Sequence, residues 1–397
     1  MATLSGFNGW LLSTVNYLAA MSDYLNIADF LSPIDRNVIS QDAGYREGQI
    51  GREVTVYEEG FPDLEGAHLV LVGCGEQRGS GLITESGAAD EVRAAFYALY
   101  HWHHDIKIAD VGNIRIGKSV ADTYAALKLV IGELNDAGKM VVILGGSHDL
   151  TLAQYYAFAD KKKAIDAAGV DAIIDINLDS ANRSDHFLME LLTAEPNYMN
   201  HYNHLAFQSY FVHPRMLETM DKLRFDCFRV GVVKEHIDEM EPVLRGCSIF
   251  SFDVTAIAHA FAPANVVTPN GLNGEEACTL MQYAGMSNNM RSIGLYGFQP
   301  ENDRDALTAK QLAQMLWYLM DGLSRGAREV PLEERASYNE FNTVFAEVET
   351  VFLQSKKTGR WWLQLPDGQW IACSHRDYLL ASSNQIPERW LRAQERP

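Results

Sequence analysis

The sequence is poor in basic residues. Its 33 Lys and Arg stand against 52 Asp and Glu, which gives a formal net charge of −19 at pH 7. Binding to nucleic acid or to an acidic membrane requires a basic patch that neutralises phosphate groups. The composition therefore predicts that neither nucleic acid nor a membrane surface is a partner of this protein.

Long apolar runs and paired cysteines are also missing. No run approaches the roughly 18 to 20 apolar residues of a membrane-spanning helix, and the partly apolar stretch GWLLSTVNYLAAM (9–21) lacks a basic leader. We expect an amphipathic helix there. The cysteines are odd in number and form no CxxC motif: Cys74, Cys227, Cys247, Cys278 and Cys373. This argues against a disulfide framework or a zinc ribbon and favours a cytoplasmic location.

Apolar, β-rich runs alternate with helical stretches in the centre of the chain. The runs are HLVLVGCG (68–75), KMVVILGG (139–146), DAIIDINLD (171–179), FDCFRVGVV (225–233), CSIFSFDV (247–254) and RSIGLYGF (291–298). Such alternation is typical of a parallel sheet covered by helices on both faces. We predict an α/β domain over residues 65–330, with an N-terminal helical extension over 1–64 and a C-terminal extension over 331–397.

The C-terminal extension has a hairpin pattern. SKKTGRWWLQLPDGQWIACS predicts two strands joined at Pro366-Asp367-Gly368, and DYLLASSN predicts a helix after them. We expect this small α+β element to pack on the main domain, with Trp361 and Trp362 in its core or at an oligomer contact. Before it, a helix is expected over 304–325, with Thr308 as its N-cap.

A glycine-rich loop, GCGEQRGSG (73–81), follows the first apolar run. Its spacing differs from the G-x-G-x-x-G of dinucleotide-binding folds, and no acidic residue follows a second strand at the expected distance. We therefore interpret it as a tight turn.

Residues of metal-ligand type stand at the ends of three predicted strands. GGSHD supplies His148, IDINLDS supplies Asp175 and Asp179, and SFDV supplies Asp253. If 171–179 is a strand, Asp175, Asn177 and Asp179 share one face. Carboxyl ends of parallel strands meet at one edge of a sheet, and one imidazole with three carboxylates suits an ion such as Mn²⁺. Singly, Asp253 could cap a helix and His148 could be a hydrogen-bonded core histidine.

Several motifs occur in the order of a known family. GGSH resembles the GGDH of arginases, agmatinases and formiminoglutamases (the ureohydrolases), IDINLD resembles their DAHxD, and SFDVTAIAHAFAPA resembles their SxDxDxxDPxxxP. LVGCGEQRGSGLITESGAADEVR and TPNGLNGEEA are weaker matches. The resemblance covers residues 65–325 and is most apparent to formimidoylglutamases. It implies a three-layer α/β/α fold with a mainly parallel sheet and a homo-oligomer, a trimer or a hexamer.

In that family, two manganese ions share a bridging hydroxide that attacks a guanidinium or amidine carbon. The resemblance implies that one metal position is complete, with His148, Asp175, Asp179 and Asp253 as ligands. The second position is degenerate, because Asn177 stands at its histidine and Thr255 at its second aspartate. An amide and a hydroxyl lack the charge that retains an ion. A histidine nearby could substitute: His186, His201, His204 or His259.

Two further residues match family positions that contact substrate. Glu276 corresponds to the glutamate that pairs with a guanidinium and, with Asp179, is a candidate catalytic residue. Arg183 could bind a substrate carboxylate, or it could be a solvated surface residue.

Three hypotheses follow. The first is a protein with a degenerate metal centre that binds or regulates rather than performing two-metal hydrolysis. The second is a hydrolase of C–N bonds in linear amidines, such as N-formimino-L-glutamate, that uses one metal or a rearranged site. The third is a structural oligomer in which the site is only a polar core cluster. One Mn²⁺ or another divalent cation is the expected cofactor, and a protein without a cofactor is the alternative. A small amidine or amino-acid-like molecule is the expected ligand.

Overall fold

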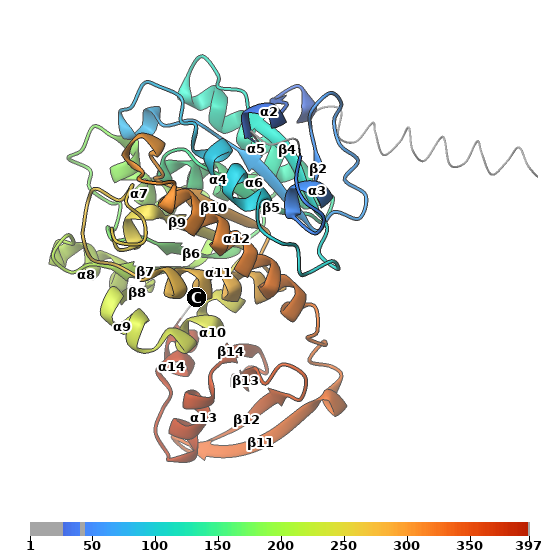
Figure 1. The fold of residues 1–397 in the computed structure, drawn as a ribbon. Helices are drawn as coiled ribbons and strands as arrows, with labels where there is room; N and C mark the ends of the chain where they lie inside the picture. Colours follow the sequence, from blue (N-terminus) through green and yellow to red (C-terminus); the bar gives the residue numbers. More distant parts are fainter. Residues whose placement is uncertain (1–26, 40–43, 396–397) are drawn as a thin grey trace, which may run out of the picture.

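The computed structural model describes residues 27–39 and 44–395 (Figure 1), so the helix expected over 9–21 lies outside the described residues. A ten-stranded sheet has the order β1-β4-β3-β5-β10-β9-β6-β7-β8, with β2 paired to β4. Its strands are β1 Leu31–Ser32, β2 Thr55–Val56, β3 Leu69–Gly73, β4 Ile108–Ile114, β5 Met140–Leu144, β6 Ile165–Val170, β7 Met199–Phe207, β8 Asp226–Arg229, β9 Ile249–Asp253 and β10 Ser292–Tyr296. All pairs are parallel except β1 with β4, which confirms the predicted sheet.

Helices cover both faces of the sheet and complete three layers (Figure 1). They are α2 Arg36–Ile39, α3 Ile50–Glu53, α4 Ala88–Tyr97, α5 Val120–Asp136, α6 Thr151–Ala159, α7 Phe187–Leu192, α8 Pro214–Lys222, α9 Val230–Glu235, α10 Met240–Arg245, α11 Gly274–Met286 and α12 Leu307–Gly326. In β3, Leu69 and Leu71 join one core with α4, α11 and α12, whereas Val70 and Val72 join the other with α5 and α6. Side chains that alternate along a strand thus build two cores. Within the described ranges, no helix is long and apolar enough to cross a membrane.

The strand expected over 171–179 is wrong. The strand is β6, which lies earlier, at Ile165–Val170, and residues 171–179 form an irregular loop. β6 pairs with β9 on one side and β7 on the other, so its backbone hydrogen bonds are satisfied although Ala and Gly make up half of it. The run at 225–233 is also only partly a strand, since α9 begins at Val230. In the main sheet, β4, β7 and the short β1 and β2 were not predicted.

The N-terminal region is less helical than expected in its described part, because β1 and β2 extend the main sheet beside β4. The helix expected over 304–325 is α12, but Thr308 lies inside it rather than at its cap. The side chain of Asp303 accepts from the backbone N–H groups of Thr308 and Ala309 at 2.9 and 3.2 Å. A carboxylate five residues upstream therefore caps this helix.

The C-terminal extension is a separate antiparallel sheet followed by two helices. Its elements are β11 Tyr338–Phe345, β12 Val348–Ser355, β13 Trp361–Gln364, β14 Trp370–Cys373, α13 His375–Ser382 and α14 Glu388–Glu395. The predicted hairpin joins β13 to β14, and Gly368 has the positive φ of +90° that its turn requires. Trp361 and Trp362 are buried in its two small cores.

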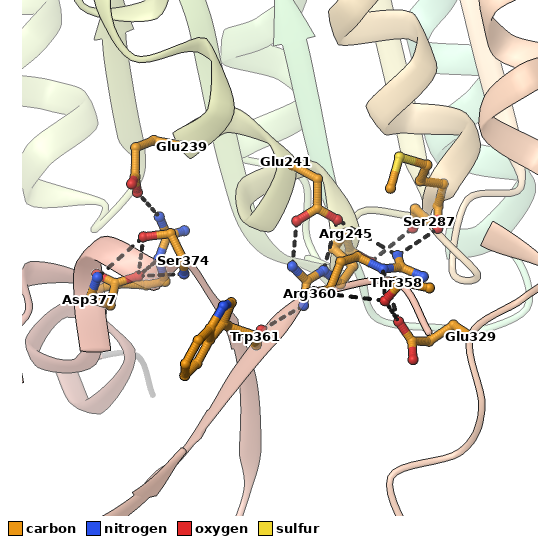
Figure 2. A network of polar contacts seen from close by, with 12 residues as sticks. Glu239, Glu241, Arg245, Ser287, Glu329, Thr358, Arg360, Trp361, Ser374 and Asp377 are labelled. Atoms are coloured by element: carbon orange, nitrogen blue, oxygen red, sulfur yellow. Dashed lines mark hydrogen bonds and ion pairs between the residues drawn. The ribbon is translucent and has the colours of Figure 1, made fainter. Parts of the chain in front are cut away.

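Buried ion pairs join this extension to the main domain (Figure 2). Arg245 of α10 donates to the backbone oxygen of Trp361 at 2.7 Å, and its guanidinium lies 4.5 Å from the ring centre of Trp362. Arg360 donates to the backbone oxygen of Met286 at 2.9 Å and pairs with Glu329 at 3.0 Å. Charges buried in this way hold only with their partners in place, so the extension packs on the main domain.

A cavity of about 780 Å³ lies between the two parts. Asp166 and Asp226, at the amino ends of β6 and β8, line it together with Trp370 and Arg389 of the extension. It therefore opens at the edge of the sheet opposite the carboxyl ends of the strands, where the sequence predicts the site.

Candidate metal centre

His148 is positioned by a tight turn at the end of β5. Gly145 and Gly146 both have positive φ, and a Cβ on Gly146 would lie 2.4 Å from Leu150 Cδ1 and 2.7 Å from the backbone oxygen of Cys74. Only glycine fits there. The turn brings the buried imidazole of His148 over the neighbouring strand ends.

Three carboxylates converge on Nδ1 of His148. Its distances are 2.8 Å to Asp171 Oδ2, 3.2 Å to Asp175 Oδ2 and 3.8 Å to Asp253 Oδ2. Asp171 follows β6 directly, and Asp253 ends β9. β5, β10, β9 and β6 are consecutive in the sheet, so the four side chains come from one stretch of its carboxyl edge. All four residues are at least nine-tenths buried.

Hydrogen bonds fix which nitrogen of His148 faces the carboxylates. Thr151 Oγ1 donates to the backbone oxygen of His148 at 2.8 Å, so Ser251 Oγ, 2.7 Å away, must donate to Thr151. The oxygen of Ser251 is then free to accept from His148 Nε2 at 2.7 Å. Nε2 therefore carries a proton, and Nδ1 is the nitrogen that faces the acids. Nδ1 donates to Asp171 while the ring is protonated, and its lone pair becomes available to an ion once that proton is lost. This is how proteins orient a metal-ligating histidine.

The pKa shifts in the cluster show that it favours bound positive charge. Burial and the neighbouring charge of Asp171 raise the pKa of Asp175 well above its usual range and the pKa of Asp253 to about 6. Burial acts to lower the pKa of His148, but hydrogen bonds to Asp171 and Asp175 outweigh it and hold that pKa well above its usual value. Burial acts to raise the pKa of Asp171, but the hydrogen bond and charge of His148 outweigh it and lower the pKa.

No Lys or Arg forms an ion pair with these three carboxylates within the described part of the chain. Three buried acids facing one imidazole are a donor set for a hard or borderline divalent cation. Such an ion would take the place of the bound protons. The residues present therefore fit a single ion at this position.

The predicted ligand set needs one correction. Asp179 and Asn177 are exposed in the loop after β6, and the structure does not bring them to the cluster. Asp171, which the sequence reasoning missed, lies there instead. Because β6 ends at Val170, the family pattern DAHxD begins at Asp171 and ends at Asp175. The run DAIID (171–175) was the sequence feature that could have identified Asp171 as a ligand. In this alignment Ile173 stands at the histidine of the family pattern.

Thr255, predicted at a degenerate metal position, does lie beside the cluster. Its hydroxyl donates to Asp171 Oδ1 at 2.7 Å, and its backbone N–H donates to Asp253 Oδ1 at 2.8 Å. Asp253 thus also caps the short turn that follows β9. One oxygen of each of these two acids is therefore already bound by Thr255, on the side away from His148 Nδ1.

Neither predicted substrate-contacting residue is free. Glu276 closes a capping box at the start of α11 by accepting from the backbone N–H of Asn273 at 2.8 Å, and it pairs with Lys234 at 2.7 Å. Arg183 pairs with Glu190 at 2.5 Å and lies over the ring of Tyr124. Lys234 of the same chain thus occupies the Glu276 carboxylate with which a substrate guanidinium would have to pair.

The four histidines considered as substitute ligands do not join the cluster. His204 comes near it, with Nε2 3.3 Å from the backbone oxygen of Asp171, and burial lowers its pKa to about 4. His201 pairs with Asp226, and His259 Nδ1 lies 2.8 Å from the backbone oxygen of Asn265. The remaining one, His186, lies immediately before α7, at its N-cap position.

Comparison with known proteins bears on this site. The family model "Arginase family" matches residues 67–321. No curated protein matches the chain.

Among solved structures, formimidoylglutamase from Bacillus subtilis has a TM-score of 0.60 at 18% identity over 77% of this chain and 98% of that one. A Mn²⁺-containing formiminoglutamase from Trypanosoma cruzi has a TM-score of 0.58 at 16% identity, over 66% of this chain and 94% of that one. Arginase from Medicago truncatula has a TM-score of 0.53 at 18% identity, over 64% of this chain and 87% of that one. At these identities the likeness establishes the fold, and the family match, which spans well over half of the chain, establishes that this protein belongs to the arginase family.

Proposed function

We propose that this protein holds one divalent cation, Mn²⁺ in the first instance, on His148, Asp171, Asp175 and Asp253. It acts as a binding or regulatory protein for a small amidine or amino-acid-like ligand and does not carry out two-metal hydrolysis. The Mn²⁺ in the T. cruzi formiminoglutamase supports the choice of ion. The net charge of −19 keeps nucleic acids and acidic membranes outside the proposal.

The single observation that carries the proposal is the environment of Thr255. A second ion would need Asp171 and Asp253 as shared ligands, and Thr255 already donates hydrogen bonds to an oxygen of each. Ile173 and Thr255 supply no imidazole and no further carboxylate. A neutral hydroxyl and an alkyl group do not offset the charge of a second ion.

One ion would still supply positive charge that polarises a bound ligand. The chain's own residues would do the rest: three carboxylates balance the charge, and Ser251 holds the imidazole in the ligating tautomer. Two ions together stabilise both the attacking and the leaving atoms of a hydrolysis, and one ion cannot do so. The pairing of Glu276 with Lys234 also leaves a guanidinium without its expected partner.

A second candidate function is hydrolysis of linear amidines with a single ion. The completeness of the four-residue set favours it, since a relic site need not keep one imidazole and three converging acids. Turnover therefore has to be measured alongside metal content.

Elemental analysis of the full-length protein, stripped with chelator and then dialysed against MnCl₂, tests the proposal. We expect one equivalent of Mn per chain, its loss in Asp171→Asn and its retention in the control Asp179→Asn, whose side chain is exposed in the loop. Release of urea, ammonia or formamide from arginine, agmatine, guanidinobutyrate and formiminoglutamate should stay at background. Two equivalents of Mn would overturn the proposal, and turnover with one equivalent would establish the second candidate.

A further inference from the structure

A second group of ligand-type side chains lies at the other edge of the sheet. The segment HWHHD (101–105) precedes β4, and its backbone is anchored: His101 N–H donates to the backbone oxygen of Gly48 at 2.7 Å, and Trp317 Nε1 donates to that of Tyr100 at 3.0 Å. Glu53 ends α3, which packs beside α4. Because this segment enters β4 at its amino end, the group is separate from the metal centre at the carboxyl ends.

Two imidazoles and a carboxylate converge there. Glu53 Oε2 lies 2.7 Å from His101 Nδ1 and 3.4 Å from His104 Nδ1. One ligand atom from each of the three residues lies within 4.8 Å of the other two. His101 is buried, whereas Glu53 and His104 are exposed, so the group is anchored on one side and open to solvent on the other.

The tautomer of His101 makes this arrangement informative. Its Nε2 lies 3.1 Å from the backbone oxygen of Ile106, which can only accept, so Nε2 carries a proton. In the neutral ring, Nδ1 then presents a lone pair to a carboxylate oxygen. A carboxylate oxygen 2.7 Å from Nδ1 therefore calls for either a proton on Nδ1 or a cation bound beside the pair. A histidine whose second nitrogen donates to a backbone carbonyl is the usual form of a metal ligand.

We propose that Glu53, His101 and His104 form a surface site for a zinc-class divalent cation, Zn²⁺ or its analogues Co²⁺ and Ni²⁺. Two imidazoles and one carboxylate suit these ions, whereas Mn²⁺ and Mg²⁺ prefer oxygen ligands. Ligand atoms about 2.0 to 2.1 Å from a tetrahedral ion are about 3.3 Å apart. The contacts of Glu53 with the two imidazoles, 2.7 and 3.4 Å, need only small movements to reach that spacing. Three protein ligands leave one coordination position open to water or to a small ligand.

Two tryptophans beside the site provide a local reporter. The ring of Trp317 lies 5.1 Å from that of His103, between the two proposed histidine ligands in sequence, and 6.3 Å from that of Trp102. Trp102 is 75% exposed. Co²⁺ bound at this site should therefore quench part of the tryptophan fluorescence.

The test uses the full-length Asp171→Asn protein, stripped of metal, so that the central site does not contribute. Zn²⁺ competition with a chromogenic chelator should give one equivalent of bound Zn²⁺ per chain, and Co²⁺ should quench fluorescence at the same stoichiometry. His104→Ala, at an exposed position where folding is not at risk, should weaken Zn²⁺ binding by about tenfold or more. His103→Ala, in the same segment but outside the ligand set, is the matched control and should bind as the parent does.

Two results would overturn the site. Absence of bound Zn²⁺ in the Asp171→Asn protein would mean that a protonated His101 provides the cation that Glu53 faces. Equal Zn²⁺ affinity in His104→Ala and His103→Ala would mean that bound Zn²⁺ lies elsewhere. Either outcome leaves the Mn²⁺ content of the unmodified protein, and so the proposed function, untouched.

Discussion

Under the proposed function, the double substitution Ile173→His with Thr255→Asp supplies the two ligands that a second metal ion would need. We expect it to raise Mn content from one equivalent per chain to two. Both positions are set by the structure: Ile173 N–H donates to Asp171 Oδ1 at 3.0 Å, and Thr255 Oγ1 donates to the same oxygen at 2.7 Å. The new side chains therefore start beside the carboxylate that two ions would share.

The energetic cost in the metal-free state can be estimated from these contacts. Losing the hydrogen bond from Thr255 to a charged acceptor costs about 1.5 to 3 kcal/mol. A carboxylate in its place faces Asp171, and a like-charge contact near 4 Å adds up to about 4 kcal/mol at an effective dielectric constant near 20, less whatever protonation relieves. We expect the metal-free double variant to be about 3 to 5 kcal/mol less stable than the parent. Mn²⁺ at a thousandfold excess over its Kd would return about 4 kcal/mol.

Urea unfolding with chelator and with saturating MnCl₂, together with elemental analysis, measures both effects. The matched control is Asn177→His with Thr255→Asp, which carries the same new carboxylate but places the imidazole in the exposed loop. It should show the same loss of stability without the second equivalent of Mn. A second equivalent in the control, or none in the Ile173→His variant, would show that the family pattern does not begin at Asp171.

Two further predictions concern pH and the C-terminal extension. The folded-state pKa of Asp253, about 6, lies above the usual 3.8, so the stability contributed by its proton is complete below about pH 4 and lost as pH rises through about 6. Mn²⁺ replaces that proton, and the raised pKa values of Asp175 and His148 act in the same direction. The affinity for Mn²⁺ should therefore fall by about tenfold or more from pH 7 to pH 5, as measured by the EPR signal of free Mn²⁺. The rise in Tm that Mn²⁺ causes should shrink over the same range in thermal melts. An unchanged affinity across this range would mean that the ion binds elsewhere. Arg360→Met leaves Glu329, 5% exposed, without its cation and should lower the free energy of unfolding by about 3 kcal/mol. Arg335→Met, which removes an exposed guanidinium 4.4 Å from the ring centre of Trp370, should cost about 1 kcal/mol or less, and equal losses in urea unfolding would contradict the buried-pair account.

Much of the fold was readable from the sequence because its strands are continuous apolar runs that end in polar residues. β5 and β9 end in this way, and His148 and Asp253 were placed correctly at their ends. β6 was misplaced because IDAAGV is rich in small residues, whereas the loop after it, AIIDI, has the stronger apolar signal. That shift of register put Asp179 in the site and left Asp171 out.

The amino-acid sequence by itself determined the family, the parallel three-layer fold and three of the four side chains that converge at its carboxyl edge, namely His148, Asp175 and Asp253. Only the tertiary structure decided which aspartate follows a strand, because β6 is a strand through its pairing with β7 and β9 rather than through its own composition. The tertiary structure also decided which partners Thr255 and Glu276 have. Thr255 reaches Asp171 across 84 residues, and Lys234 reaches Glu276 across 42. Such contacts depend on how distant segments meet in the folded chain, and local sequence patterns do not encode them.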